Sequence, residues 1–537
     1  MGAWKVWAKR CGVLLTLAMG LSACGGGGSG SSLTSGGPGS GSGGNPPAGD
    51  GWVSGVYQPS AHYAAQCAKP RSGVDPTTKQ SYPDVQGTTT DENNWLRSWT
   101  NELYLWYNEV PDIDPGTYSS TASYFQVLKT SATTSTGHEK DRFHFTYPTS
   151  QWEQMSQAGV DIGYGVTWDL AVSTPPRQAY AGYVWSGYAA AQAGVVRGAQ
   201  IMQIDGVDLV NASDQASVDT LNQGLSPTTA GETHTFTLLD PGATTTYTVT
   251  LQAAAVTEAP VPVVTTLSTG TGPVGYILFN DHIATAEAAL INGIQQLKAA
   301  GVTDLVLDMR YNGGGYLAIA SELAYMIAGP VPTAGQAFDQ IAFNSKYPST
   351  NPVTNQPLSP TPFYTVSQGL SSSPAAGTSL PYLGLQRVFV LTGPGTCSAS
   401  EAVMNGLNGV NVQVIQIGST TCGKPYGFYP QDNCGTTYFS IEFQGDNAKG
   451  FGNYPDGFSP QNSSTLTSAP LPGCSVADDF SHQLGDASEG RLAAALGYRS
   501  AGMCTVAPSG LGPPAVQANK HSAVHRAPWR EIAIRTP

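Results

Sequence analysis

The sequence predicts a multidomain α/β protein in three folded parts: a helical N-terminal region, a β-rich middle domain, and a core with a mixed or parallel sheet. The length of 537 residues allows about three domains of ordinary size. Large aromatic residues recur at helical spacing near the start, and short β-type segments separated by glycine follow them. Apolar strands then alternate with helical patterns, as in α/β domains.

Charged residues are scarce, at 11% of the chain, whereas a typical soluble domain has about 25%. The 24 Lys and Arg residues are outnumbered by 37 Asp and Glu residues, which gives a net charge of −13. Such a chain cannot neutralise a phosphate backbone. The charge balance therefore excludes a nucleic-acid-binding protein.

Residues 1–23 have the layout of a signal peptide, because basic residues precede an apolar stretch too short to span a membrane. This stretch ends in Leu21-Ser22-Ala23-Cys24, which resembles the lipobox of bacterial lipoproteins, where the Cys is lipid-modified. The alternative is ordinary cleavage after Ala23, with Cys24 incidental. Residues 24–51 are nearly all Gly, Ser and Pro, a flexible tether. No Asp follows Cys24, so we expect a lipid anchor in the outer membrane of a bacterial cell envelope, facing the periplasm or the surface.

Six of the eight cysteines remain once Cys11 leaves with the signal peptide and Cys24 carries lipid. An even number in an oxidising compartment indicates disulfides, with 15 possible connectivities. Sequence proximity favours Cys422–Cys434 and Cys474–Cys504. Neither a C-x-x-C pair nor an H-E-x-x-H motif occurs, so we expect no metal and no cofactor.

The N-terminal region, residues 52–157, contains Trp95, Trp99, Leu103 and Trp106 at spacings of three and four. This spacing places them on one face of a helix, and a packed structural helix is the interpretation we favour.

Residues 158–256 form the β-rich domain. Gly163-Tyr164-Gly165-Val166 opens it, and residues 193–206 read AGVVRGAQIMQIDG. Together these segments resemble a PDZ domain, in which a glycine-bearing loop holds the terminal carboxylate of a peptide that pairs with a sheet edge. The resemblance implies that residues 163–166 form this carboxylate loop.

Residues 265–503 form the predicted α/β core, which follows a Pro/Thr/Gly connector at Pro260–Pro273. We expect a surface insertion at 329–381 and a disordered tail at 504–537. The expected strands are Val274–Phe279, Asp304–Met309, Val388–Thr392 and Val412–Ile417, and the expected helices are Thr285–Ala300, Tyr316–Ala328 and Ser398–Leu407. Two of these strands are continuously apolar, which is typical of strands buried on both faces.

Three polar segments lie at the ends of these strands. Residues 308–315, DMRYNGGG, form a glycine-rich turn that can expose backbone N–H groups to an anion. Residues 396–401, TCSASE, contain a Ser-x-x-Glu pattern, which is a helix capping box by default but also places Ser398 in the favourable field of a helix start. Residues 422–427, CGKPYG, contain Lys424, one of few lysines, without charged neighbours.

In this order the three segments resemble the C-terminal processing (tail-specific) serine peptidases, over roughly residues 91–498. The resemblance implies that Ser398 is the nucleophile and Lys424 the general base, with the Ala399 N–H and a glycine N–H of the 313–315 turn, Gly314 above all, as the oxyanion hole. A lysine accepts a proton only when it is neutral. Burial can lower a lysine pKa by about 3 units, which is what this role requires.

Two positions depart from the family pattern. Gly409 stands where many members have Asp, and Phe428 stands where they often have Gln. The role of any third residue is therefore open. Cys397, next to Ser398, is a rival nucleophile, but no histidine lies near it in the sequence.

The sequence thus predicts a serine endopeptidase of the cell envelope that hydrolyses unfolded or C-terminally exposed polypeptides with a Ser398/Lys424 dyad. The alternative is a non-catalytic, PDZ-containing lipoprotein scaffold that binds peptides. An acyl-transfer or hydratase-like enzyme with the same oxyanion geometry is a third hypothesis, although no segment resembles a nucleotide-tail site.

Overall fold

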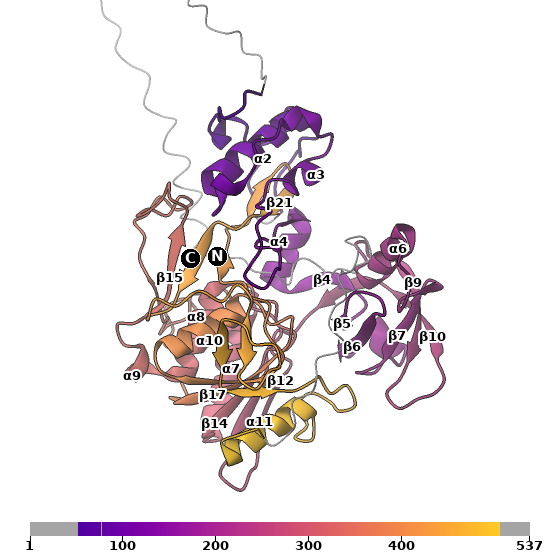
Figure 1. Cartoon of the computed structure of the whole chain (residues 1–537), viewed down its shortest axis with the longest axis vertical. Coiled ribbons are helices and arrows are strands. Elements are labelled where there is room, and N and C mark those ends of the chain that lie inside the picture. The colour runs from indigo at the N-terminus through magenta and orange to yellow at the C-terminus, as the bar shows by residue number, and fades with distance from the viewer. Residues whose placement is uncertain (1–51, 77, 505–537) are drawn as a thin grey trace, which may run out of the picture.

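The computed structural model describes residues 52–76 and 78–504. It confirms the mixed α/β class: the N-terminal region, the β-rich domain and a large α/β domain are distinct in Figure 1. The expected signal peptide, Cys24, the tether and residues 505–537 of the expected tail lie outside the described residues. Cys504, where that tail was expected to begin, is described and bonded to the large domain.

The N-terminal region packs around a helix that begins with a capping box between Thr88 and Asp91. Trp95 and Trp99 of this helix are buried and stacked, with ring centroids 5.2 Å apart. Trp106 was expected on the same helix, but the helix ends at Leu103 and Trp106 lies beyond it, edge-on to the Tyr426 ring. The elements are η1 (Ser60–His62), β1 (Gln66–Cys67), β2 (Val85–Gln86), α2 (Thr89–Leu103), η2 (Tyr107–Glu109), η3 (Pro115–Thr117), α3 (Thr121–Phe125), β3 (Phe145–Pro148) and α4 (Thr149–Ala158).

The β-rich domain is built on one antiparallel sheet in the order β10-β9-β7-β6-β5, with β5 at its edge. A helix, α6, flanks the sheet (Figure 1). The elements are β4 (Val160–Gly163), β5 (Val166–Val172), β6 (Gln178–Val184), α5 (Ala189–Gln192), β7 (Gln200–Ile204), β8 (Val207–Asp208), α6 (Gln215–Leu225), β9 (Thr233–Leu239), β10 (Tyr247–Gln252) and β11 (Ala254–Thr257).

The large domain has a central sheet in the order β12-β13-β14-β17-β18-β25, in which only the β12–β13 pair is antiparallel. Helices α7, α8 and α10 pack on one face and α11 on the other, so the central strands are buried on both faces as predicted. The elements are β12 (Val263–Leu267), β13 (Val274–Leu278), α7 (Ala286–Ala299), β14 (Asp304–Asp308), α8 (Leu317–Ala328), α9 (Pro330–Thr333), β17 (Arg387–Thr392), α10 (Ala399–Gly409), β18 (Gln413–Gly418), β25 (Gly473–Ser475) and α11 (Gly490–Ala501).

Two segments expected to be irregular contain strands. The connector at 260–273 contains β12, because its β-branched Val and Thr side chains suit an edge strand. The expected surface insertion at 329–381 contains β15, whose Phe338 is buried against α10. A second sheet therefore runs in the order β16-β15-β22-β19, with bounds β15 (Ala337–Phe343), β16 (Thr361–Pro362), β19 (Tyr426–Gly427) and β22 (Phe443–Asp446).

One of the remaining strand pairs joins the N-terminal region to the large domain. β3 pairs with β21 (Thr436–Phe439), which also pairs with β20 (Gln431–Asn433). β23 (Phe458–Pro460) pairs with β24 (Ala469–Leu471).

The structure contains three disulfides: Cys67–Cys434, Cys397–Cys422 and Cys474–Cys504. The expected Cys474–Cys504 pair is present. The expected Cys422–Cys434 pair is wrong, because the loop after β18 carries Cys422 to the start of α10, whereas Cys434 lies in the β20–β21 turn beside the N-terminal region.

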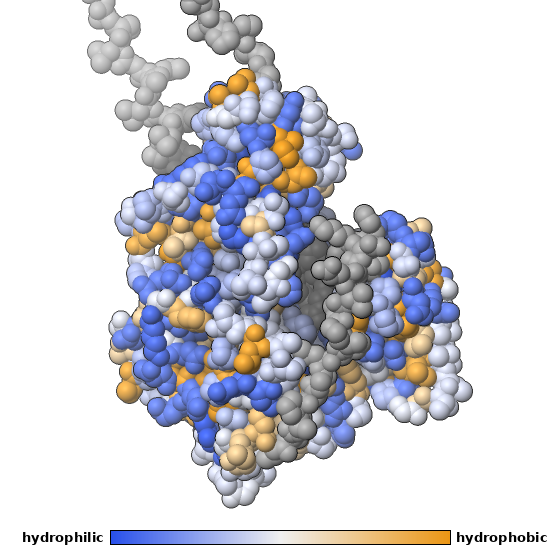
Figure 2. Space-filling view, in the orientation of Figure 1, coloured by the Kyte–Doolittle hydropathy of each residue, from blue (hydrophilic) through white to orange (hydrophobic). Residues whose placement is uncertain are grey.

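The visible face of the molecule mixes hydrophilic and hydrophobic residues (Figure 2). Among residues 52–76 and 78–504, no helix combines the length and the apolar character that crossing a bilayer requires.

Candidate active site

Ser398 lies between β17 and α10, at the start of the helix, and is 5% exposed. Its backbone has φ +52° and ψ −103°, in a region that non-glycine residues rarely occupy. Such a conformation persists only where the surroundings impose it, and it is concentrated at functional sites. The turn presents Ser398 to a cleft that it shares with Ala399 and Lys424.

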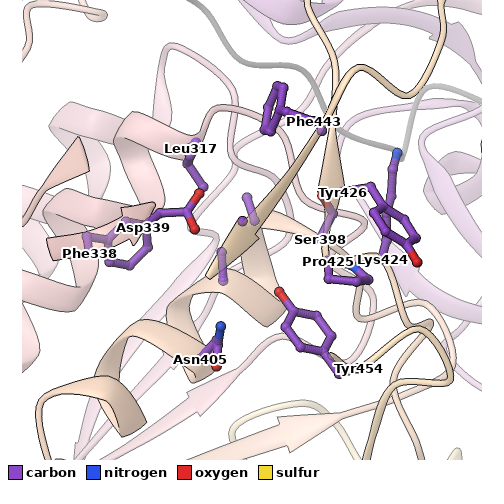
Figure 3. Close-up of a pocket in the computed structure, with 14 residues that line it drawn as sticks. Leu317, Phe338, Asp339, Ser398, Asn405, Lys424, Pro425, Tyr426, Phe443 and Tyr454 are labelled. Carbon is purple, nitrogen blue, oxygen red and sulfur yellow. The ribbon is translucent and has the colours of Figure 1, made fainter. Parts of the chain in front are cut away.

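This Ser398 cleft contains about 420 Å³ of empty space and opens to solvent. Figure 3 shows it with Asp339 on one side, Lys424 on the other and Ser398 between them. Its lining residues are Leu317, Phe338, Asp339, Ser398, Ala399, Ala402, Asn405, Lys424, Pro425, Tyr426, Gly427, Phe443, Gly445 and Tyr454.

Ala399 is the first residue of α10, so its N–H has no partner within the helix. Among the described residues, no acceptor is found for this N–H. Together with the helix dipole, it is a donor suited to a developing negative charge beside Ser398.

Lys424 lies in the loop after β18 and is 1% exposed. Its Nζ is 4.3 Å from the ring centre of Phe428 and 4.9 Å from that of Phe143. The Phe428 ring therefore occupies the position where the family pattern often has Gln. Phe143 comes from the N-terminal region, so two parts of the chain enclose the amine. The preceding Gly423 has φ +82°, and a Cβ there would lie 2.4 Å from the Pro455 carbonyl oxygen.

The buried Glu401 carboxylate joins the Ser398 turn to the Lys424 loop. It accepts hydrogen bonds from the N–H groups of Ser398 at 2.9 Å and Lys424 at 2.8 Å. The Gly423 N–H and the Thr421 hydroxyl donate to its other oxygen, at 2.9 and 2.5 Å. Burial raises the pKa of Glu401, while these four donors oppose that shift. The predicted capping interaction of Glu401 with the Ser398 N–H is thus one part of a larger cluster.

The Cys397–Cys422 disulfide connects the same two segments covalently. Cys397 therefore presents no thiolate in this structure, which argues against it as the nucleophile. Cys397, Glu401 and Cys422 also form the one metal-like cluster found among the described residues, but two of its three ligand atoms are joined to each other in the disulfide. This cluster does not fit a metal ion.

The glycine-rich turn packs against the Ser398 turn, because the Asn312 carbonyl accepts hydrogen bonds from Cys397 N–H and Ser400 Oγ. The Gly314 N–H, expected in the oxyanion hole, instead donates to Asn312 Oδ1 at 2.9 Å, and Gly314 does not line the Ser398 cleft. In this structure its N–H is committed to the turn itself, so that expectation needs correction.

His282 supports this turn from a fully buried position. Its Nδ1 lies 3.0 Å from Asn312 Oδ1, and burial lowers its pKa to about 3. It is therefore neutral near pH 7 and donates its Nδ1 proton to Asn312.

Gly409, the other position that departs from the family pattern, does not line the Ser398 cleft. Gly409 ends α10, where a Cβ would contact Asn447 at 3.0 Å, so it leaves no room for the acidic residue of the family pattern without rearrangement. Asp339 and Tyr454, in contrast, line the Ser398 cleft and were not identified from the sequence. Asp339 lies in the segment expected to be an insertion, and the local sequence AFDQIAF has no regular alternation that would have singled it out.

Gly163, Tyr164, Gly165 and Val166 all line a second cleft, between β5 and the end of α6. Gly165 has φ +75°, and a Cβ there would lie 2.2 Å from the Tyr188 Cβ, so only glycine allows this loop. The Tyr164 hydroxyl donates to the Gly224 carbonyl at 3.0 Å and ties the loop to α6. Because β5 is an edge strand, an extended peptide can pair with it beside this loop.

Comparison with known proteins agrees with this architecture. Residues 91–147 match the "Peptidase S41 N-terminal domain" and residues 273–427 match "Peptidase family S41". A carboxyl-terminal-processing protease from Picosynechococcus sp. (strain ATCC 27264 / PCC 7002 / PR-6) is 28% identical over 245 residues, which cover 44% of this chain. The chain spans about half the length of this curated relative, 49%.

A crystal structure of a Bacteroides fragilis NCTC 9343 protein assigned to the S41 proteases shares the fold. It has a TM-score of 0.53 at 23% identity, and the match covers 78% of this chain and 98% of that one. The matched segments contain both the Ser398 turn and the Lys424 loop, together with Phe143 of the N-terminal region. Two segments of the chain, residues 91–147 and residues 273–427, therefore carry the N-terminal domain and the peptidase domain of family S41.

Proposed function

We propose that this protein is a serine endopeptidase that hydrolyses polypeptides with Ser398 as nucleophile and Lys424 as general base. The observation that carries the proposal is the position of Ser398. It stands at positive φ at the start of α10, in one cleft with a buried lysine. The family to which the matched segments belong agrees with this chemistry.

In the proposed mechanism the neutral Lys424 amine takes the Ser398 hydroxyl proton while Oγ bonds to the carbonyl carbon of the substrate. The Ala399 N–H stabilises the resulting oxyanion. Lys424 then gives the proton to the leaving amine as the C–N bond breaks. A water molecule, deprotonated by the same amine, hydrolyses the acyl-enzyme and restores Ser398. Both steps require a neutral amine, the form that removal from water favours.

We further propose that the β-rich domain delivers substrates by their C-termini. The support is the cleft formed by the 163–166 loop at the β5 edge. Because the sequence carries a lipobox ending in Cys24, we place the enzyme in the cell envelope on a lipid anchor. Unfolded or C-terminally exposed polypeptides are the substrates that such a location and docking site suggest.

A non-catalytic peptide-binding scaffold is the second candidate. Gly409 and Phe428 favour it, because neither can orient Lys424 by a hydrogen bond from its side chain, and so does the committed Gly314 N–H. Binding of C-terminal peptides without turnover over hours would select this candidate.

The test compares the full chain with Ser398→Ala and Lys424→Arg in cleaving an unstructured reporter protein. We expect both variants to lose cleavage by at least about 1,000-fold with a nearly unchanged Tm. Alanine lacks the hydroxyl that attacks the substrate, and arginine cannot give up its proton to act as the base. Lys449→Met, which removes an exposed lysine, is the control and should cleave normally. Full activity of Ser398→Ala, or of Lys424→Arg, would contradict the respective role.

A further inference from the structure

The Ser398 cleft contains a carboxylate that the proposed mechanism does not use. Asp339, on β15, is only 8% exposed, and its side chain points into the cleft from the side opposite Lys424 (Figure 3). Within the described part of the chain, no side chain donates a hydrogen bond to it; the Gln340 backbone N–H is the only donor that acts on it. A buried carboxylate with so few partners is costly unless a ligand completes it.

The surroundings of Asp339 have the form of a side-chain pocket. Leu317, Phe338 and Phe443 line the cleft with apolar surface, and Asp339 lies against Gly445. A Cβ on Gly445 would lie 2.3 Å from Asp339 Oδ1, so glycine leaves room for the carboxylate there. The Tyr454 hydroxyl also points to the middle of the cleft (Figure 3). A long side chain with an apolar stem and a cationic end fits this arrangement.

The pocket adjoins both Ser398 and the proposed oxyanion donor. Ala399, whose N–H faces the oxyanion in the proposed mechanism, lines it beside Ser398. The carbonyl group held there belongs to the residue that precedes the scissile bond, so that residue's side chain is next to this pocket.

We propose that Asp339 is a specificity-determining residue that selects lysine or arginine immediately before the scissile bond. The proposal rests on the peptidase function proposed above and names its substrate class. The ammonium or guanidinium group pairs with the carboxylate, and the methylene groups cover the apolar walls.

Ionisation of Asp339 gives the proposal a pH signature. Burial, together with the nearby Asp446 carboxylate on β22, raises the pKa of Asp339 to about 7. The other titratable groups that face it from neighbouring segments are Tyr454, Lys424 and Tyr426. The preference for a basic residue should therefore increase between about pH 6 and pH 8, as the carboxylate becomes charged.

The first experiment uses two amidated peptides that differ only in lysine or norleucine at the residue before the cleaved bond. Norleucine keeps the stem and lacks the amine, and amidation removes the carboxylate that the 163–166 loop would hold. We expect kcat/KM to be roughly 10- to 100-fold higher for lysine at pH 8. This ratio should fall toward pH 6. Groups that act equally on both substrates, including Lys424, change the two kcat/KM values by the same factor, so their ionisation does not alter the ratio.

Asp339→Asn, which keeps the shape of the side chain, should reduce the ratio to near one. Asp446→Asn, on the neighbouring strand and outside the cleft lining, is the matched control and should keep the preference. Equal rates for the two peptides, a preference that survives Asp339→Asn, or lysine found after the cleaved bond by mass spectrometry would each overturn the proposal.

The second experiment needs no catalysis. Calorimetric titration of Ser398→Ala with the same two peptides should show tighter binding of the lysine peptide, by roughly 10-fold or more, and loss of that difference in Ser398→Ala/Asp339→Asn. If the wild type cleaves nothing while this difference holds, the peptidase function fails and the pocket assignment stands. Equal binding of the two peptides overturns the assignment whatever the activity.

Discussion

At the scale of single residues, Glu401 organises the site more than either proposed catalytic side chain does. One buried carboxylate accepts four hydrogen bonds, two of them from the backbones of Ser398 and Lys424. Charge-assisted bonds of this kind fix the geometry of both segments at once. Glu401 touches no substrate in the proposed mechanism, so it is a positioning residue.

Glu401→Gln should lower kcat by about 100-fold or more and change KM little, because an amide offers donors where two N–H groups need an acceptor. Steady-state kinetics on the unstructured reporter protein measures kcat and KM, and thermal unfolding measures whether the variant keeps its stability. Glu442→Gln is the matched control. Glu442 is equally buried and burial raises its pKa well above the usual range, but its described donor is the Tyr429 N–H, which the amide oxygen of a glutamine also accepts. Equal losses in the two variants would contradict the positioning role.

The resemblance of three short motifs pointed to Ser398 and Lys424, whose roles are proposals, and local spacing predicted the capping interaction of Glu401, which is present. The sequence could not show that Glu401 also accepts from residues 421–424, because nothing local in the sequence reports which loop packs against a helix start. The oxyanion-hole role expected for the Gly314 N–H could not be settled from the sequence for a related reason. The direction of that N–H depends on whether Asn312 Oδ1 or an anion accepts its hydrogen bond. Asp339 is near Ser398 only through the pairing of β15 with β22.

At the scale of elements, the Ser398 turn and the Lys424 loop are held together by the Cys397–Cys422 disulfide. Arg142 of the N-terminal region adds hydrogen bonds to the carbonyls of Cys422 and Pro455. The loop that carries Lys424 is therefore restrained at Cys422 both by the disulfide and by a residue from outside the peptidase domain.

Replacing Cys397 and Cys422 by serine should lower the free energy of unfolding by about 3 kcal/mol and reduce kcat by at least about 10-fold, because the loop of 25 residues is no longer closed. The control replaces Cys474 and Cys504, which close a loop of similar length, 30 residues, away from the cleft. It should cost similar stability and leave kcat near that of the wild type. Chemical denaturation and peptide kinetics measure the two effects. Equal kcat values in the two double variants would mean that the disulfide near Ser398 has no role in positioning.

The bounds of the predicted strands and helices of the α/β domain lie within one or two residues of the observed bounds, because apolar strands and amphipathic helices can be recognised from their periodicity. β12 and β15 were missed since Pro, Ser and Thr around them made the segments look irregular. Pairing with β13 and β22 decided their conformation instead. The disulfide partners of Cys67 and Cys422 depend on tertiary packing and were not predictable from spacing.

At the scale of the whole molecule, Arg197 connects the β-rich domain to the large domain. Its guanidinium pairs with Asp478 at 2.8 Å and donates to the Tyr311 hydroxyl at 2.7 Å, next to the glycine-rich turn. Arg310 of that turn pairs with Asp478 and Glu489. These cations hold the pKa of Asp478 far below its usual range. Arg197 lies in the motif that suggested a PDZ domain, but nothing in that motif indicates Asp478 as its partner.

Arg197→Met should uncouple peptide docking from cleavage. We expect kcat/KM to fall about 10-fold for a long substrate with a free C-terminus, and by less than about 3-fold for a short amidated peptide, because only the former uses the β-rich domain. Arg177→Met, whose described hydrogen bonds stay within that domain, is the control for domain stability. An equal loss for both substrates in Arg197→Met would argue against coupling.

The Cys67–Cys434 bond, which spans 367 positions of the chain, determines how this protein responds to backbone cleavage. Any backbone nick between those positions leaves the two fragments attached, so a self-cleaved or protease-clipped molecule would migrate as one band until reductant is added. Tension applied near residue 67 would likewise bypass the intervening polypeptide and pass directly to the β20–β21 hairpin.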